Sequence, residues 1–137
     1  MIEARYFSQS ALLELLREKP QQGRRMLPLP AGVTEMPFGI LEDSAVENAP
    51  EIHRREGDLW QCLAGEVTFL VNGELIGATK RAREDGSSNP DELVGERIED
   101  GTTYALRPGD WLWIPPGVPH QHVASATARL VIIKIRG

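Results

Sequence analysis

The chain has 137 residues, a formal net charge of −5 and an apolar content of 41%, ordinary values for one globular domain. Its lysines and arginines are scattered, so no basic patch indicates nucleic-acid binding. No apolar run approaches the roughly 20 residues that a membrane span needs. The start, MIEARYFSQS, lacks the pattern of a signal peptide, and a single cysteine excludes an internal disulfide. We expect one domain over residues 1–137, a cytoplasmic location, and neither a nucleic-acid nor a membrane partner.

A short helix is predicted within the N-terminal segment, residues 1–22, in the stretch SQSALLELLREKP. Ser10 is the predicted N-cap, four leucines between residues 12 and 16 form an apolar stripe, and Pro20 ends the helix. Because an isolated helix this short is marginal, we expect the stripe to pack on the rest of the chain.

From residue 24 to residue 137 the chain has the pattern of short strands separated by Gly and Pro. Asn72-Gly73 is typical of a tight hairpin turn, because both residues tolerate a positive φ. Residues 79–92, TKRAREDGSSNPDE, carry almost no apolar side chains, and we predict a mobile surface loop there. Many short strands behind one helix indicate a mainly-β sandwich or barrel. The predicted strands are RRMLPLP, PFGILED, DLWQCLAG, EVTFLVNGELIGA, TTYAL, DWLWIP and ARLVIIKI.

The three histidines of the chain fall on two predicted strand pairs. His120 and His122 lie in IPPGVPHQH, and the alternation of a strand places both on one face. His53 shares a face with Glu51 by the same rule, and Asp58 opens the next strand. Imidazoles and carboxylates are thus arranged so that they can converge inside a barrel. The alternative for each histidine is a strand residue held by a hydrogen bond.

The second of these segments resembles a motif of the cupin family, G-x5-P-x-G-x2-H-x3-N. The match runs in register from Gly109 through Pro115 and Gly117 to His120, and Ala124 stands in place of the final Asn. The stretches LAGEVTFLVNGEL and IPPGVPHQH are also similar to those of small bacterial single-domain cupins. The resemblance implies a double-stranded β-helix, or jelly-roll barrel, preceded here by one short helix.

The family's other motif, G-x5-H-x-H-x(3,4)-E-x6-G, is matched less literally. Glu51 stands at its first His, His53 at its second His, and Asp58 at its Glu. Gly65 closes the motif with the right spacing, whereas Ala45 occupies the position of the leading Gly. The two motifs together span about Ala45 to Ala124.

The resemblance implies that Glu51, His53, Asp58 and His120 are metal ligands. Two imidazoles with one or two carboxylates and open positions suit a divalent transition metal such as Fe, Mn, Ni or Zn. Asp58 is one methylene shorter than the family's Glu, so its reach depends on the backbone. His122 lies outside the family pattern on the same inward face, and three roles are open to it: a ligand in place of Glu51, a catalytic acid–base group, or a polar residue that only lines the cavity.

Two functions remain open from the sequence. The first is a small metal-dependent enzyme of dioxygenase, isomerase or lyase type that acts on a small oxygen-rich molecule. The second is a non-catalytic module that binds or senses a small molecule or metal. Single-domain cupins commonly dimerise, and near-continuous apolar runs such as VIIKI and DWLWIP predict a homodimer.

Overall fold

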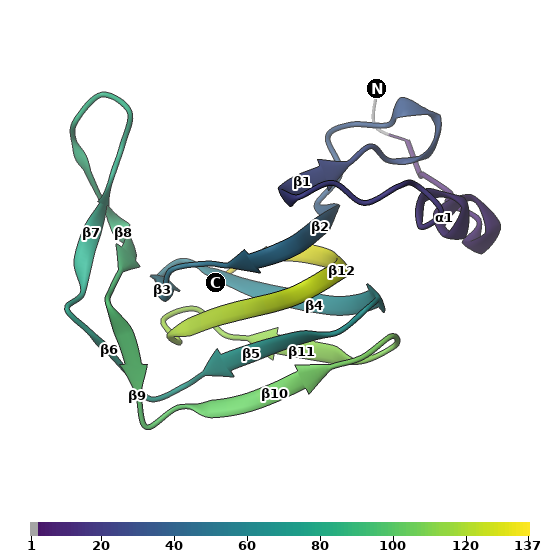
Figure 1. Ribbon diagram of the computed structural model, residues 1–137. Coiled ribbons are helices and arrows are strands. Elements are labelled where there is room, and N and C mark those ends of the chain that lie inside the picture. The colour runs from purple at the N-terminus through teal and green to yellow at the C-terminus, as the bar shows by residue number, and fades with distance from the viewer. Residues whose placement is uncertain (1–2) are drawn as a thin grey trace.

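The computed structural model describes residues 3–137, and over this range it is mainly β with one N-terminal helix, as the sequence predicts (Figure 1). The sheet elements form a jelly-roll barrel, which confirms the predicted fold class. The elements are α1 (Gln9–Leu15), β1 (Gly23–Leu27), the 3-10 helix η1 (Pro30–Gly32), β2 (Phe38–Glu47), β3 (Glu51–His53), β4 (Glu56–Ala64), β5 (Val67–Val71), β6 (Glu74–Ile76), β7 (Thr79–Ala82), β8 (Ser88–Val94), β9 (Arg97–Glu99), β10 (Thr102–Leu106), β11 (Trp111–Ile114) and β12 (His120–Arg136).

The 17-residue strand β12 organises the barrel (Figure 1). Its first residues pair with β3 and β5, and its later residues pair with β4. Strand β2 runs antiparallel along much of its length, and a register shift between Ala124 and Thr127 marks a bulge. Because a bulge bends a strand, β12 can contribute to both halves of the barrel. Strands β10 and β11 extend the sheet from β5 and β4.

The inward faces of these strands form one apolar core. Strand β5 is an example: Val67, Phe69 and Val71 are buried, while the residues between them are half-buried. This alternation is the period of two expected for a strand with one face on a core. The buried core consists of Leu41, Trp60, Cys62, Val67, Phe69, Val71, Leu106, Ile114, Ala124, Ala128 and Leu130.

The helix differs from its prediction. Ser8, not Ser10, is the N-cap, and its Oγ accepts a hydrogen bond from the Ala11 N–H at 3.1 Å. No residue of α1 is fully buried: Leu12, Leu15 and Leu16 are half-buried and Leu13 remains 51% exposed, so the leucine stripe packs on the rest of the chain only in part. Polar contacts at its C-terminal end also hold this segment. No helix in residues 3–137 is long and apolar enough to cross a membrane.

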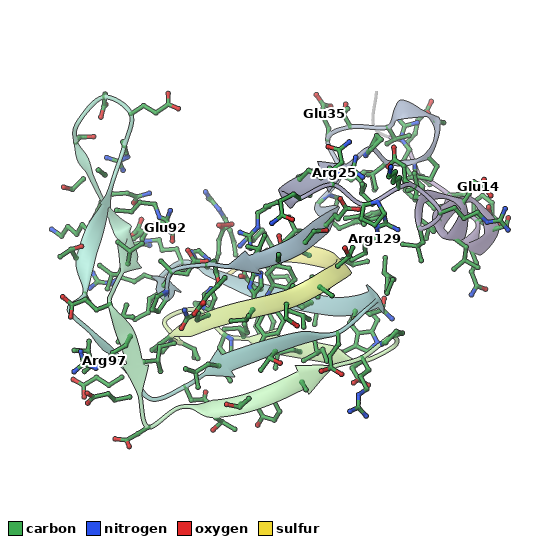
Figure 2. All side chains as sticks on the ribbon, in the orientation of Figure 1. Glu14, Arg25, Glu35, Glu92, Arg97 and Arg129 are labelled. Carbon is green, nitrogen blue, oxygen red and sulfur yellow. The ribbon has the colours of Figure 1, made fainter. Side chains whose placement is uncertain are left out.

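Those contacts centre on the buried carboxylate of Glu42. Arg25 Nε donates to Glu42 Oε2 at 2.6 Å, and the Nη2 of Arg129 donates to Oε1 at 2.7 Å. Arg129 also donates to the backbone carbonyls of Leu16 and Glu18, which ties the segment after α1 to the sheet. Figure 2 shows Arg25 and Arg129 together at the side of the barrel where α1 lies. A buried carboxylate with this many donors is fully satisfied and stabilises the docked segment.

The segment from Thr79 to Glu92 is not an irregular loop, so the predicted loop is wrong. It forms most of the hairpin β7–β8, closed by a turn in which the Arg83 N–H donates to the Ser87 carbonyl at 2.7 Å. Strand β8 also pairs with β3. Backbone pairing on both sides of β8 stabilises strand structure without apolar side chains, which is why hydrophobic periodicity did not reveal it.

The predicted Asn72-Gly73 turn is confirmed in its conformation, with φ values of 67° and 70°. Its flanking strands do not pair with each other, however. Strand β5 pairs with β10 and β12, and β6 pairs with β9. A Cβ at Gly73 would lie 2.1 Å from the Glu99 carbonyl oxygen, so this tight approach also requires glycine.

We predict that Glu42→Gln destabilises the protein by about 3 kcal/mol, because it leaves the buried guanidinium of Arg129 without a charged partner. Hydrogen bonds from Arg25 and Arg129 outweigh the effect of burial and lower the pKa of Glu42 to about 2. A depressed pKa contributes stability above the ordinary pKa of 4.5, and this contribution is lost as the pH falls toward 2.

Urea denaturation across this pH range measures both effects. Glu42→Gln should be less stable near neutral pH and should lose part of the acid dependence of the wild type. The matched control is Glu47→Gln on the exposed end of the same strand, for which we expect a change within about 0.5 kcal/mol. Equal stability of the wild type and Glu42→Gln at every pH would contradict this account.

The homodimer predicted from the sequence stays a prediction, and β11 is the surface that we expect to form it. Among residues 3–137 this strand pairs with β4 alone, and Trp111 and Trp113 on it are 56% and 45% exposed. Exposed aromatic side chains on an edge strand favour association with another chain. Light scattering should give the mass of a dimer, and Trp111→Lys should shift it toward a monomer. A monomer mass at all concentrations of the wild type rules this out.

Candidate metal centre

Two short segments bring three potential metal ligands together. Strand β3 carries Glu51 and His53 on one face, and β12 begins at His120, which pairs directly with Glu51 in the sheet register. One ligand atom from each of the three side chains lies within 4.8 Å of the other two. His53 and His120 are buried, and their ring centroids are 4.9 Å apart. The sheet register therefore assembles the cluster from residues about 70 positions apart in sequence.

The spacing of these atoms fits a shared metal ion. Glu51 Oε1 lies 3.4 Å from the Nε2 atoms of both His53 and His120. Two ligands bound at about 2.1 Å to one tetrahedral ion are about 3.4 Å apart. The carboxylate oxygen and the two imidazoles are thus spaced as neighbouring ligands of one ion would be.

The hydrogen bonds of the two imidazoles set their tautomers. His53 Nδ1 lies 2.7 and 2.9 Å from the two carboxylate oxygens of Glu92, and His120 Nδ1 lies 3.0 Å from the carbonyl oxygen of Val118. Because both partners only accept, each Nδ1 carries a proton, and the neutral form of each ring therefore has its lone pair on Nε2. Both Nε2 atoms are buried without a hydrogen-bond partner among residues 3–137. Buried unsatisfied nitrogens aimed at one carboxylate are what a metal site requires.

Asp58 flanks this three-residue cluster. Its Oδ2 lies 3.7 Å from the Nε2 atoms of both His53 and His120, and its side chain is only 2% exposed. Its Oδ1 accepts a hydrogen bond from Lys134 Nζ at 2.7 Å. The shorter side chain of Asp58 therefore faces the imidazoles from the opposite strand, β4, slightly farther away than Glu51.

The second oxygen of Glu51 is also paired with a cation. Arg81, on the β7–β8 hairpin, donates from Nη2 to Glu51 Oε2 at 2.6 Å. Burial raises the pKa of Glu51, but His120 and His53, which donate from Nε2 when they are protonated, outweigh it and hold the pKa below its usual range. Glu51 is therefore ionised at neutral pH, with Oε1 directed at the imidazoles.

His122 lies outside the three-residue cluster, so Glu51 rather than His122 completes it. The Nε2 atom of His122 is 2.8 Å from Asp43 Oδ2 and 2.8 Å from Arg24 Nη2, and Arg24 pairs with both oxygens of Asp43. Burial raises the pKa of Asp43, but His122 and Arg24 outweigh it and lower this pKa to about 2. The other ring nitrogen of His122, Nδ1, is buried without a partner among the described residues.

The sequence did not predict three residues that lie at the centre: Glu92, Arg81 and Lys134. Glu92 and Arg81 lie in the stretch interpreted as a loop, where no hydrophobic pattern marks a strand. The pairing of β3 with β8 places Glu92 opposite His53, which only the long-range register determines. Lys134 did leave a signal, because a single charge interrupts the apolar run VIIKI.

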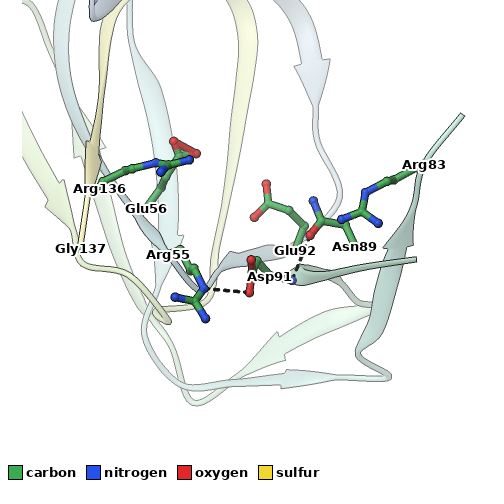
Figure 3. A pocket seen from close by; sticks show the side chains of 8 residues that line it. All are labelled: Arg55, Glu56, Arg83, Asn89, Asp91, Glu92, Arg136 and Gly137. Atoms are coloured by element: carbon green, nitrogen blue, oxygen red, sulfur yellow. Dashed lines mark hydrogen bonds and ion pairs between the residues drawn. The ribbon is translucent and has the colours of Figure 1, made fainter. Parts of the chain in front are cut away.

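A polar pocket of about 390 Å³ lies behind the centre, and Figure 3 shows the residues around it. Glu92 forms part of its wall and contacts His53, which links the pocket to the cluster through one hydrogen bond. Three arginines and three acidic residues line it, so its charges balance: Arg55, Arg83, Arg136, Glu56, Asp91 and Glu92. Through Glu92, the wall of this pocket accepts a hydrogen bond from the imidazole of His53. Glu51, His53 and His120 are not among the residues that line the pocket.

No protein-family model matches the chain, and no curated protein matches it in sequence. Solved structures do match it. E. coli ycfD has a TM-score of 0.56 at 23% identity over 73% of this chain. The Drosophila melanogaster CENP-C cupin domain has a TM-score of 0.48 at 13% identity over 72% of the chain. Recombinant oxalate oxidase in complex with glycolate has a TM-score of 0.46 at 18% identity over 71%.

The chain spans only 25%, 56% and 40% of the lengths of these three structures, respectively. At such identities the likeness concerns the fold alone. The likeness to ycfD supports the mainly-β jelly-roll fold that the cupin-like motifs imply.

We predict that the purified protein holds about one divalent transition-metal ion per chain, and that His53→Ala and His120→Ala each lose it on dialysis against a chelator. Each substitution removes one of the two unpaired nitrogens. His122→Ala is the matched control, because His122 lies outside the cluster, and it should retain the ion. Elemental analysis measures all four proteins. Retention of the wild-type stoichiometry by both His53→Ala and His120→Ala would show that the assigned site is wrong.

Proposed function

We propose that the protein is a small metal-dependent enzyme that acts on a small oxygen-rich molecule, with an ion such as Fe, Mn, Ni or Zn held by Glu51, His53 and His120 and flanked by Asp58. The observation that carries the proposal is the pair of buried Nε2 atoms without hydrogen-bond partners, each 3.4 Å from the same carboxylate oxygen. A bound ion of this kind would supply Lewis acidity and, when redox-active, an oxygen-binding centre.

The residues around the site limit how the carboxylates bind. Arg81 donates a hydrogen bond to Oε2 of Glu51, and Lys134 donates one to Oδ1 of Asp58. Each carboxylate is therefore left with one oxygen for an ion, which keeps other coordination positions open for a substrate.

The same residues set the charge of the site. The charges of the two carboxylates cancel that of a divalent ion, and the two cations Arg81 and Lys134 outweigh the one further carboxylate, Glu92 beside His53, so the surroundings are positive. A positive site with open positions favours an oxyanion or another chelating oxygen ligand.

His122 is the group that we assign to acid–base work. Nε2 donates to Asp43, which fixes the ring, and Nδ1 is buried without a partner among the described residues. An imidazole oriented by a carboxylate, with its second nitrogen available, is the usual arrangement for holding or passing a proton. Trp60 and Phe69 pack against the ring at centroid distances of 5.4 and 4.9 Å and keep water from it.

A non-catalytic module that binds a metal or a small molecule is the alternative, and one experiment separates the two. Protein stripped of metal and reconstituted with Fe²⁺ is assayed for oxygen consumption with candidate catechols and diketones, alongside Mn²⁺, Ni²⁺ and Zn²⁺ forms assayed for substrate loss. Turnover that His122→Gln lowers, without loss of metal, supports the enzyme. If the protein binds one metal ion per chain but none of its four metal forms consumes any candidate substrate, the result supports the binding module.

We predict that Arg81→Gln raises the affinity for Zn²⁺ by about three- to tenfold, because it removes a positive charge next to a ligand carboxylate. Arg83→Gln is the matched control, since Arg83 lies on the same hairpin but contacts Ser87 and Ser88 rather than Glu51. Competition with a chromophoric chelator measures both variants. An unchanged or weaker affinity of Arg81→Gln would mean that Arg81 does not oppose the charge of the ion.

A further inference from the structure

A second cavity, of about 450 Å³ and wide open to solvent, lies on β1, β2 and β12 and differs in chemistry from the polar pocket that Glu92 lines. Its wall is apolar except for one cation: Met26, Met36, Pro37, Phe38, Ile132 and Lys134. Neither an aspartate nor a glutamate lines it. A volume of this size suits a small organic molecule.

The cavity lies on the inner face of the barrel sheet rather than on its outside. Ile132 pairs with Trp60 of the core on one side and with Gly39 on the other. Met26 pairs with Leu41, which also belongs to the core. Because paired residues share a face of the sheet, the cavity wall continues the core surface at the place where the barrel is open.

Lys134 connects this cavity to the metal centre. It pairs with Asp58 in the sheet register, and its Nζ contacts Asp58 Oδ1 at 2.7 Å. The other oxygen of Asp58 faces the Nε2 atoms of His53 and His120 at 3.7 Å. A single ion pair therefore lies between the apolar cavity and the cluster.

We propose that this cavity is the substrate pocket of the centre, and that the substrate is a small carboxylate with a hydrocarbon or aromatic body. The inference deepens the proposed function and rests on it for the role of the metal. The apolar wall would hold the body, and the flexible thioethers of Met26 and Met36 would adapt to its shape. Lys134, the one cation among the described residues of the wall, gives one N–H to Asp58, and its remaining N–H donors would bind the carboxylate.

Calorimetric titration with acetate, butyrate and hexanoate tests the pocket, with each acid measured on Zn²⁺-loaded and on metal-free protein. Affinity should rise roughly fourfold with each methylene in both forms, because each one buries apolar surface. The ion should strengthen the binding of all three acids by a common factor. An affinity that does not increase with chain length in either form overturns the proposal.

Two variants localise the effect. Met26→Ser should flatten the dependence of affinity on chain length, and Leu13→Ser is its control because Leu13 is similarly exposed, 51% against 55%, and is not among the residues that line the cavity. Lys134→Met should lower the affinity for all three acids about tenfold. The same rise with chain length in Met26→Ser as in the wild type would place the binding elsewhere.

The two forms of the protein also separate this inference from the proposed function. If the wild type fails to retain Zn²⁺ but still shows the rise with chain length, the pocket stands and the metal enzyme does not. If Zn²⁺ is retained and the rise is missing, the metal centre stands and this pocket is not its substrate site.

Discussion

The pairing of β12 with its neighbours is the constraint on which the site depends. This one strand pairs His120 with Glu51 of β3 near its start, and Lys134 with Asp58 of β4 near its end. The first pairing creates the carboxylate–imidazole cluster, and the second positions the carboxylate that faces it from the other side. A slip of one residue in the pairing of β12 would turn every one of its side chains to the opposite face. The site therefore forms only in the observed register of β12.

The buried charges of the molecule fall into two kinds. Glu42 is surrounded by donors from Arg25, Arg129 and the backbone of Gln21, so it is satisfied by the protein alone and serves to fasten the N-terminal segment. The imidazoles of His53 and His120 each have one nitrogen satisfied and the other buried without a partner. An unpaired polar atom in the interior destabilises a fold unless something binds it, and this contrast is the physical basis for assigning a metal to the second group.

Local sequence signals predicted the elements whose side chains alternate between core and surface, and they predicted the inward faces of Glu51, His53 and His120 from strand periodicity. They failed where tertiary contacts decide the structure. The β7–β8 hairpin has no apolar pattern because backbone pairing holds it, so Arg81 and Glu92 were placed in a loop. The α1 leucines form a stripe, yet the segment docks through Arg129, more than a hundred residues away. No local pattern reports a contact of that kind.

The most direct test of the account is a crystal structure of the protein soaked with Zn²⁺ or Mn²⁺, with anomalous diffraction recorded at the absorption edge of the metal. The account predicts one anomalous peak per chain, within about 2.3 Å of Glu51 Oε1, His53 Nε2 and His120 Nε2. A fully occupied peak elsewhere, with the two imidazole nitrogens still unpaired or bridged only by water, would contradict it.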